Sequence, residues 1–147
     1  MTTPTTSTNP STTGAPLAAG DTIPAWVLPI TPTLVVSTAI STRDFQDVHH
    51  DRDIAQAAGS KDIFVNILTS TALVERYVTE WLHERTGDWD TDVRGIAIRL
   101  GAPAYPYDTL TFTGSVASVE DGVATLQVTG AVPLGDHVTG TVKVAVR

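Results

Sequence analysis

The residues best suited to acid–base chemistry lie in one short stretch, residues 43–59. The chain has four histidines, and two of them, His49 and His50, are adjacent here. The stretch also carries the aspartates Asp44, Asp47, Asp51 and Asp53. An imidazole changes its charge near neutral pH, and a nearby carboxylate can exchange a proton with it. The stretch therefore suits an acid–base pair, a metal site or a solvated helix start.

The acid–base interpretation rests on Asp44 and His49. A carboxylate and an imidazole at this spacing, with a tight turn between them, can converge on one water molecule. Either group can take a proton from that water, and the other can deliver one. Hydration of a double bond needs this exchange. Next to a thioester, backbone N–H donors must also hold the enolate oxygen, and the N-terminus of a long helix supplies such donors.

Two other interpretations stay open from the residues alone. A metal site would use the side chains of His49, His50, Asp47 and Asp51. The order His49-His50-Asp51 resembles the metal-binding dyad of helical phosphohydrolases, but those proteins are all-helical and need further ligands far along the chain. In the solvated interpretation, Asp51 caps a short helix that ends near Gly59. We predict no bound metal.

The elements that must position this stretch are predicted from the hydrophobic pattern. Residues 33–42 are rich in β-branched side chains, which indicates a first strand. Residues 62–87 carry apolar residues at helical spacing, with Asp62 as the expected N-cap and Gly87 as the expected stop. The first half of this helix is apolar on nearly all sides, so we expect other elements to enclose it.

Four segments after the helix alternate apolar and polar residues. They cover residues 92–101, 108–120, 122–132 and 137–147. Glu120-Asp121-Gly122 is typical of a hairpin turn, and the histidines outside the first stretch, His83 and His137, are expected at a helix end and in a turn. One strand, helices and then four strands form an α+β order, with a sheet able to curl around the long helix.

Composition excludes several classes of protein. The formal net charge is −7 and the basic residues are scattered, so nucleic-acid binding is not expected. The chain has no cysteine, hence no disulfide and no thiolate nucleophile. Apolar runs are far shorter than the ~20 residues of a membrane span. We expect a cytoplasmic protein with a disordered Thr/Pro/Ser-rich tail at residues 1–20 and one domain at residues 21–147.

The order of residues in the Asp–His stretch resembles a known family. Asp44-Phe-Gln-Asp-Val-His49-His-Asp51 is similar to the D-x-N-x-x-H-x-D motif of MaoC-like, (R)-specific enoyl-CoA hydratases, which have the hotdog fold. Further similar positions are Ala55, Ala58, Gly59, Pro106, Asp108 and Leu110. The likeness covers nearly all of residues 33–147. It implies a single α+β hotdog domain with a five-stranded antiparallel sheet wrapped around the long helix.

Within that family, the chain looks closest to the small hydratase subunits of actinobacterial steroid side-chain degradation, as in cholesterol catabolism. This resemblance implies that water is added to a steroid enoyl-CoA, giving a tertiary alcohol that an aldolase later cleaves. It also implies a heteromer with a second hotdog-containing subunit. No cofactor is implied, because coenzyme A is part of the substrate.

The resemblance also assigns roles to residues. It makes Asp44 and His49 the catalytic pair that deprotonates water and returns the proton, and it gives His50 no role. The family's P-I-x-H-G segment, whose glycine N–H commonly serves the oxyanion, reads Ile63-Phe-Val-Asn66-Ile67 here. We therefore expect Asn66 and the backbone N–H of Ile67 at the oxyanion and substrate-binding site.

Two alternatives to a hydratase remain. A hotdog acyl-CoA thioesterase usually relies on a carboxylate on the long helix, for which Glu75 and Glu80 are the candidates. A non-catalytic hotdog partner would only complete the site of another subunit. The presence of both Asp44 and His49 argues against a silent partner.

Overall fold

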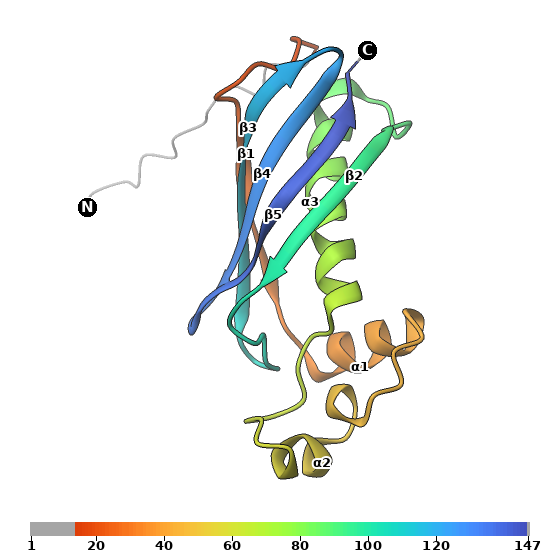
Figure 1. Cartoon of the computed structure of the whole chain (residues 1–147), viewed down its shortest axis with the longest axis vertical. Coiled ribbons are helices and arrows are strands. Elements are labelled where there is room, and N and C mark those ends of the chain that lie inside the picture. The colour runs from red at the N-terminus through yellow and green to blue at the C-terminus, as the bar shows by residue number, and fades with distance from the viewer. Residues whose placement is uncertain (1–13, 147) are drawn as a thin grey trace, which may run out of the picture.

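The computed structural model describes residues 14–146 and combines one sheet with one long helix (Figure 1). Its elements in chain order are β1 (Thr22–Pro29), α1 (Pro32–Ser41), the 3₁₀ turn η1 (Asp47–His49), α2 (Arg52–Ala57), α3 (Ile67–Thr86), β2 (Val93–Leu100), β3 (Thr109–Glu120), β4 (Val123–Val132) and β5 (Gly135–Ala145). The four strands predicted after the long helix are confirmed.

The sheet is antiparallel throughout, with the strand order β1-β3-β4-β5-β2. The first strand therefore pairs with β3, and β2 closes the opposite edge beside β5. Figure 1 shows α3 running along one face of the curved sheet, with α1 and α2 gathered at the end where α3 begins. This arrangement places the segments between α1 and α3 at one end of the molecule.

The core lies between α3 and the sheet. The helix turns a buried stripe towards the strands, formed by Leu73, Val74, Tyr77, Val78, Trp81 and Leu82. Tyr77 packs on Phe112 of β3, with ring centroids 5.5 Å apart, and its hydroxyl donates to Pro24 O at 3.0 Å. Burial raises the pKa of Tyr77 to about 12. Burial of each large apolar side chain here adds about 1.5–3 kcal/mol to the free energy of unfolding. This packing against the sheet fixes the position of α3.

The prediction of a strand at residues 33–42 is wrong, because α1 occupies this segment. Thr31 caps the helix by accepting a hydrogen bond from Leu34 N at 3.0 Å, and a proline stands in the first turn. Val35 and Ala39, one turn apart, are both buried. A cap, an N-terminal proline and a buried stripe at helical spacing outweigh the low helix propensity of the β-branched residues.

The start of the long helix also differs from the prediction. Asp62 is not its N-cap, since residues 62–66 are not helical and α3 begins at Ile67 after the cap residue Asn66. Val65 N donates to Ala104 O at 3.0 Å instead of joining the helix. The predicted stop at Gly87 is confirmed, with Gly87 in the left-handed conformation at φ 74°.

Part of the predicted tail is ordered against the domain. Gly14 N donates to Arg85 O at 3.0 Å, and Gly20 N donates to Val116 O at 2.8 Å. The structure therefore differs from the predicted disorder at residues 14–20, whereas residues 1–13 lie outside the described residues. No helix within residues 14–146 is long and apolar enough to cross a membrane.

Candidate active site

Asp44 follows directly from the way in which α1 ends. Arg43 N donates to Ile40 O at 3.0 Å and Asp44 N donates to Ala39 O at 2.9 Å, the two bonds of a Schellman motif. The motif needs a left-handed residue, and Arg43 supplies it at φ 57° although it is not glycine. The reversal of the chain brings the Asp44 carboxylate beside the start of α3.

His49 is held in a fixed orientation by the segment before α3. Its ring is buried and lies edge-on to Phe64, with centroids 4.8 Å apart. Its Nδ1 lies 2.8 Å from Phe64 O. Because a carbonyl oxygen can only accept, Nδ1 carries the hydrogen, and Nε2 of the neutral ring keeps its lone pair. That Nε2 faces Asp44 Oδ2 at 3.4 Å.

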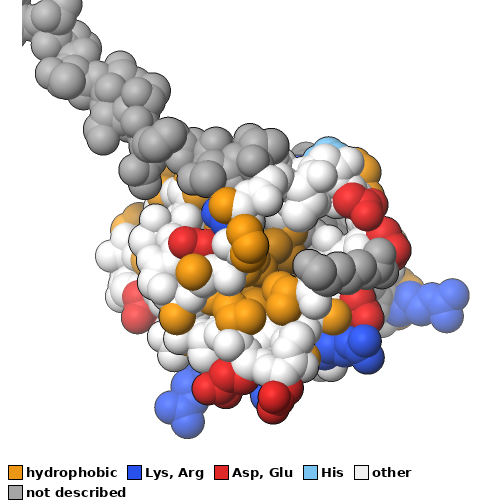
Figure 2. All heavy atoms as spheres, turned by 90° about the horizontal axis from the view of Figure 1, so that it is seen from above, with side chains coloured by type: hydrophobic (Ala, Val, Ile, Leu, Met, Phe, Trp, Pro, Cys, Tyr) orange, Lys and Arg blue, Asp and Glu red, His pale blue; other side chains and the backbone are white. Residues whose placement is uncertain are grey.

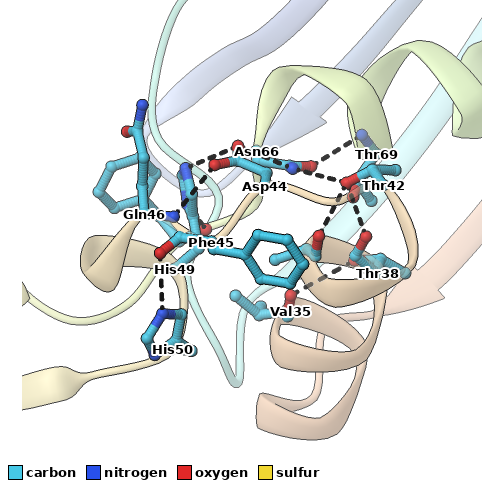
Figure 3. Close-up of polar contacts among 12 residues, drawn as sticks. Val35, Thr38, Thr42, Asp44, Phe45, Gln46, His49, His50, Asn66 and Thr69 are labelled. Atoms are coloured by element: carbon cyan, nitrogen blue, oxygen red, sulfur yellow. Dashed lines mark hydrogen bonds and ion pairs between the residues drawn. The ribbon is translucent and has the colours of Figure 1, made fainter.

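Asn66 connects the helix start to this pair (Figure 3). Its Oδ1 accepts from Thr69 N at 2.8 Å, which caps α3 and fixes the orientation of the amide. The Nδ2 group must then face the other way, and it donates to Asp44 Oδ2 at 3.0 Å and to Thr42 Oγ1 at 2.9 Å. Asn66 is 3% exposed, so its amide is shielded from solvent and these three groups are its hydrogen-bond partners.

The electrostatic effect of these contacts falls on Asp44. The hydrogen bond from Asn66 is the main reason that the pKa of Asp44 lies below its usual range. A hydrogen bond from Gln46 N and the proximity of His49 act in the same direction, and partial burial opposes them. The carboxylate is therefore ionised at neutral pH and presents a lone pair towards His49.

Three of the four predicted site residues come together in the structure: Asp44, His49 and Asn66. Ile67, the fourth, follows Asn66 as the first residue of α3. Its N–H is one of those at a helix N-terminus that have no acceptor within the helix. The Ile67 side chain is half exposed, so only the backbone belongs to the polar site.

The remaining Asp–His residues lie outside the pair. His50 is exposed, contacts Phe45 O at 3.3 Å and Asp47 Oδ1 at 3.7 Å, and points away from Asp44 in Figure 3. Asp51 caps α2 by accepting from Ile54 N at 3.1 Å, as predicted. Within residues 14–146, no three His, Cys, Asp or Glu side chains are grouped so that they could hold a metal ion.

One polar residue of the site was missed from the sequence. The Thr42 hydroxyl donates back to Thr38 O at 2.8 Å or Ala39 O at 3.1 Å, and it accepts from Asn66. It thereby holds the amide that faces Asp44. The sequence offers one signal for it, because Thr42 is the last residue of the segment 33–42. A prediction of this segment as a helix would have placed Thr42 at the helix C-terminus.

Comparison with known proteins identifies the family. The model of the MaoC-like domain matches residues 18–143. The chain belongs to the MaoC-like domain family. The match spans both the sheet and the segment around Asp44 and His49, so this segment and α3 are parts of one MaoC-like domain.

Among curated MaoC-like relatives, one from Mycobacterium tuberculosis is 58% identical over 116 residues, covering 79% of this chain and 86% of the relative. It is called 3-oxo-4,17-pregnadiene-20-carboxyl-CoA hydratase beta subunit. A chain in the crystal structure of the ChsH1–ChsH2 complex from the same organism has a TM-score of 0.82 and 54% identity, covering 88% of this chain and 98% of that one.

A more distant structure shows that the fold is shared more widely. The (R)-hydratase from A. caviae involved in PHA biosynthesis has a TM-score of 0.74 at 19% identity, covering 89% of this chain and 98% of that chain. At this identity the likeness concerns the fold alone. The predicted α+β class, with a five-stranded antiparallel hotdog sheet against one long helix, is confirmed.

Proposed function

We propose that this chain is the catalytic subunit of an enoyl-CoA hydratase acting on a steroid side-chain thioester. The observation that carries the proposal is the pair of facing acceptors, Asp44 Oδ2 and His49 Nε2, 3.4 Å apart at the start of α3. The substrate class is supported by the mycobacterial relative, which is 58% identical and is named a pregnadiene carboxyl-CoA hydratase subunit.

The geometry supports activation of water. The ionised Asp44 carboxylate accepts hydrogen bonds, and so does Nε2 of His49 when the ring carries its one hydrogen on Nδ1, so one water molecule can donate a hydrogen to each. When the pair takes one of these protons, the oxygen adds to the β-carbon of the enoyl thioester with its remaining hydrogen. The proton held by the pair then goes to the α-carbon, which completes the addition of water.

Between these steps, negative charge collects on the thioester oxygen. An N–H at a helix N-terminus stabilises an anion through both hydrogen bonding and the helix dipole. We assign this role to Ile67 N, the first backbone donor of α3. Asn66 acts mainly on Asp44, because its amide hydrogens already have acceptors in Asp44 and Thr42.

The product follows from the place of the double bond. When the β-carbon is a steroid ring carbon that bears no hydrogen, addition of water there gives a tertiary alcohol, which is a suitable substrate for a subsequent aldolase.

The proposal includes a second hotdog-containing subunit. The strands β1 and β2 end the sheet, and unpaired strand edges tend to be covered by another chain. One similar crystal structure is that of a two-component complex, ChsH1–ChsH2. A rigid steroid needs room, which a partner without its own catalytic pair can provide. We therefore propose one active site for each pair of units, carried by this chain.

The two alternatives have less support. A thioesterase would use Glu75 or Glu80, but Glu75 lies eight residues beyond Ile67, or ~12 Å along the helix. Glu80 is further away and is bonded to Arg76 at 2.8 Å. A silent partner would have no use for the aligned Asp44 and His49.

The test is an assay of the purified chain alone and after co-expression with a second hotdog-containing subunit. Both preparations are given crotonyl-CoA and a steroid enoyl-CoA, with and without exhaustive chelation, and light scattering reports the assembly. We expect steroid hydration by a heteromer, with no dependence on metal. A stable homodimer that hydrates crotonyl-CoA well by itself would contradict the heteromer, and activity restored only by added zinc or manganese would contradict the metal-free mechanism.

A further inference from the structure

A buried serine–histidine contact lies one helical turn into α3 and has no part in the water chemistry described above. Ser70 Oγ in α3 lies 2.8 Å from His137 Nε2. The two residues are 0% and 2% exposed. His137 was expected in a turn, but it belongs to β5, and its ring reaches into the core.

The hydrogen-bond directions at His137 are fixed by its other contact. Its Nδ1 lies 2.8 Å from Ala102 O, so Nδ1 carries the hydrogen. Burial lowers the pKa of His137 and so favours the neutral ring, and the hydrogen bond to Ala102 O offsets part of this effect. Nε2 therefore accepts the hydroxyl hydrogen of Ser70. Asn66 O lies 3.1 Å from both Ser70 Oγ and Ser70 N. Since the hydroxyl hydrogen points to His137, Asn66 O accepts its hydrogen bond from the backbone N–H of Ser70.

This contact ties the first turn of α3 to the sheet. Ser70 is one turn after Asn66, and Ser70 N bonds the carbonyl of that residue. The side chain of Asn66 in turn donates to Asp44. A rotation or slide of the first turn would therefore change the distance between the Asn66 amide and the Asp44 carboxylate.

A second chain of contacts leads from the same imidazole towards His49. Beside His137, the backbone of Gly101 donates to His137 O at 2.8 Å, and the next residue, Ala102, accepts from the ring. Two residues after Ala102, Ala104 O accepts a hydrogen bond from Val65 N. The residue before Val65 is Phe64, whose carbonyl oxygen orients the His49 ring. The imidazole of His137 thus lies where the contacts to both catalytic side chains meet.

We propose that Ser70 and His137 form a positioning pair for the hydration reaction, which holds the start of α3 so that Asn66 keeps its hydrogen bond to Asp44. The proposal rests on the proposed hydratase function for its kinetic consequence. The pair touches neither the water nor the substrate. A pair that only stabilised the fold would change the melting temperature without changing the Asn66–Asp44 contact.

The test uses Ser70→Ala in the full chain assembled with its partner. Loss of the hydroxyl frees the first turn of α3, so we expect kcat to fall about tenfold with little change in KM, since misplacement of a catalytic group by ~1 Å can cost up to ~100-fold. The pKa of the Asp44 carboxyl, followed by ¹³C NMR with only this chain labelled, should rise. Thr79→Ala is the control, because it also removes a hydroxyl from α3, but one that donates to Arg76 O within the same helix.

If Ser70→Ala does not fold, Ser70→Cys keeps a donor at this position, although a weaker one. It should shift kcat and the Asp44 pKa in the same directions by smaller amounts. A lower melting temperature with wild-type kcat and wild-type Asp44 pKa, in whichever variant folds, would overturn the proposal. The control should leave both quantities unchanged.

The NMR measurement separates this proposal from the proposed function. If the wild-type assembly hydrates no enoyl-CoA, the hydratase assignment fails, yet the Asp44 titration still decides whether Ser70 controls the Asn66–Asp44 contact. If the wild type is active and the Asp44 pKa is unchanged in the Ser70 variants, the proposal for Ser70 and His137 is wrong while the hydratase assignment stands.

Discussion

The two ends of α3 both carry polar contacts, but they differ in what faces the histidine. At the N-terminal end, the His49 imidazole faces the Asp44 carboxylate at 3.4 Å. At the C-terminal end, His83 stacks on the Trp89 ring with centroids 3.7 Å apart. Only the first arrangement places a carboxylate opposite the imidazole, and the proposed water activation depends on this pairing and not on the histidine alone.

The C-terminal end also shows what a structural polar network looks like. Arg85 contacts Asp21 at 3.3 Å and donates to Ala15 O at 3.1 Å. A guanidinium stays charged and has no acceptor, so it cannot exchange protons with a substrate.

The same end of the molecule also carries an apolar hollow, and Figure 2 shows the apolar side chains gathered in it. The hollow measures about 600 Å³ and is lined in part by Leu17, Leu82, Arg85, Val119, Val144 and Val146.

The largest expected effect is at the proposed catalytic pair, Asp44 and His49. Asp44→Asn and His49→Ala should each lower kcat/KM by at least ~100-fold, the scale for losing an acid–base group. The fold should remain, because neither side chain belongs to the apolar core. Steady-state rates on the steroid enoyl-CoA and thermal unfolding of the same samples provide the measurement. Hydration near the wild-type rate in either variant would remove the mechanism.

The next effect is at Asn66, which links the helix to the pair. Asn66→Ala removes the main cause of the lowered Asp44 pKa, so that pKa should rise and turnover should fall by ~10-fold or more, within the range for acid–base catalysis. Carboxyl ¹³C NMR and kcat measure the two effects.

Asn66→Asp is the matched control for the lost helix cap. An aspartate can still cap α3 but cannot donate to Asp44 when ionised. The activity loss should therefore persist in this variant. Recovery of wild-type turnover would mean that Asn66 matters only as a cap.

A smaller and different effect is expected at the other end of α3. Arg85→Ala removes the contacts to Asp21 and Ala15 and should destabilise the fold by about 1–2 kcal/mol, which lowers the melting temperature by a few degrees. Turnover of the folded protein should not change. Arg76→Ala is the control on the same helix, because its exposed bond to Glu80 should contribute less. A loss of kcat in Arg85→Ala would show that the two ends are coupled.

The smallest effect is expected at His50. Its ring is partly exposed and contacts Phe45 O and Asp47 rather than Asp44 or His49. His50→Ala should keep close to wild-type kcat and KM in the same assay. Equal losses at His49 and His50 would instead indicate a shared metal ion.

Much of the fold follows from the sequence because its signals are local. The four later strands are predicted by alternation and turns, and Gly87 is predicted as the stop of the long helix because glycine commonly follows the last helical residue. The first strand and the start of α3 were misplaced. In α1, β-branched residues indicated a strand, and the helix is explained by its Thr31 cap and by burial that only the tertiary structure shows.

The site shows the same division between local and distant contacts. Asp44 and His49 are close in sequence, so their spacing could predict a pair. Thr42 meets Asn66 across 24 residues, and Ser70 meets His137 across 67. No spacing rule reports such contacts, because they depend on how α3 and β5 pack. The supporting residues could therefore be recognised only after the fold was known.

The most direct test of the central claim is the fate of labelled water. The assembled wild-type protein and its Asp44→Asn variant are incubated with the steroid enoyl-CoA in H₂¹⁸O, and the products are examined by mass spectrometry. The account predicts that the wild type places ¹⁸O in a new hydroxyl of an intact CoA thioester, whereas the variant does so at least ~100-fold more slowly. Label in a free carboxylate, or equal labelling by the variant, would contradict water activation by Asp44 and His49.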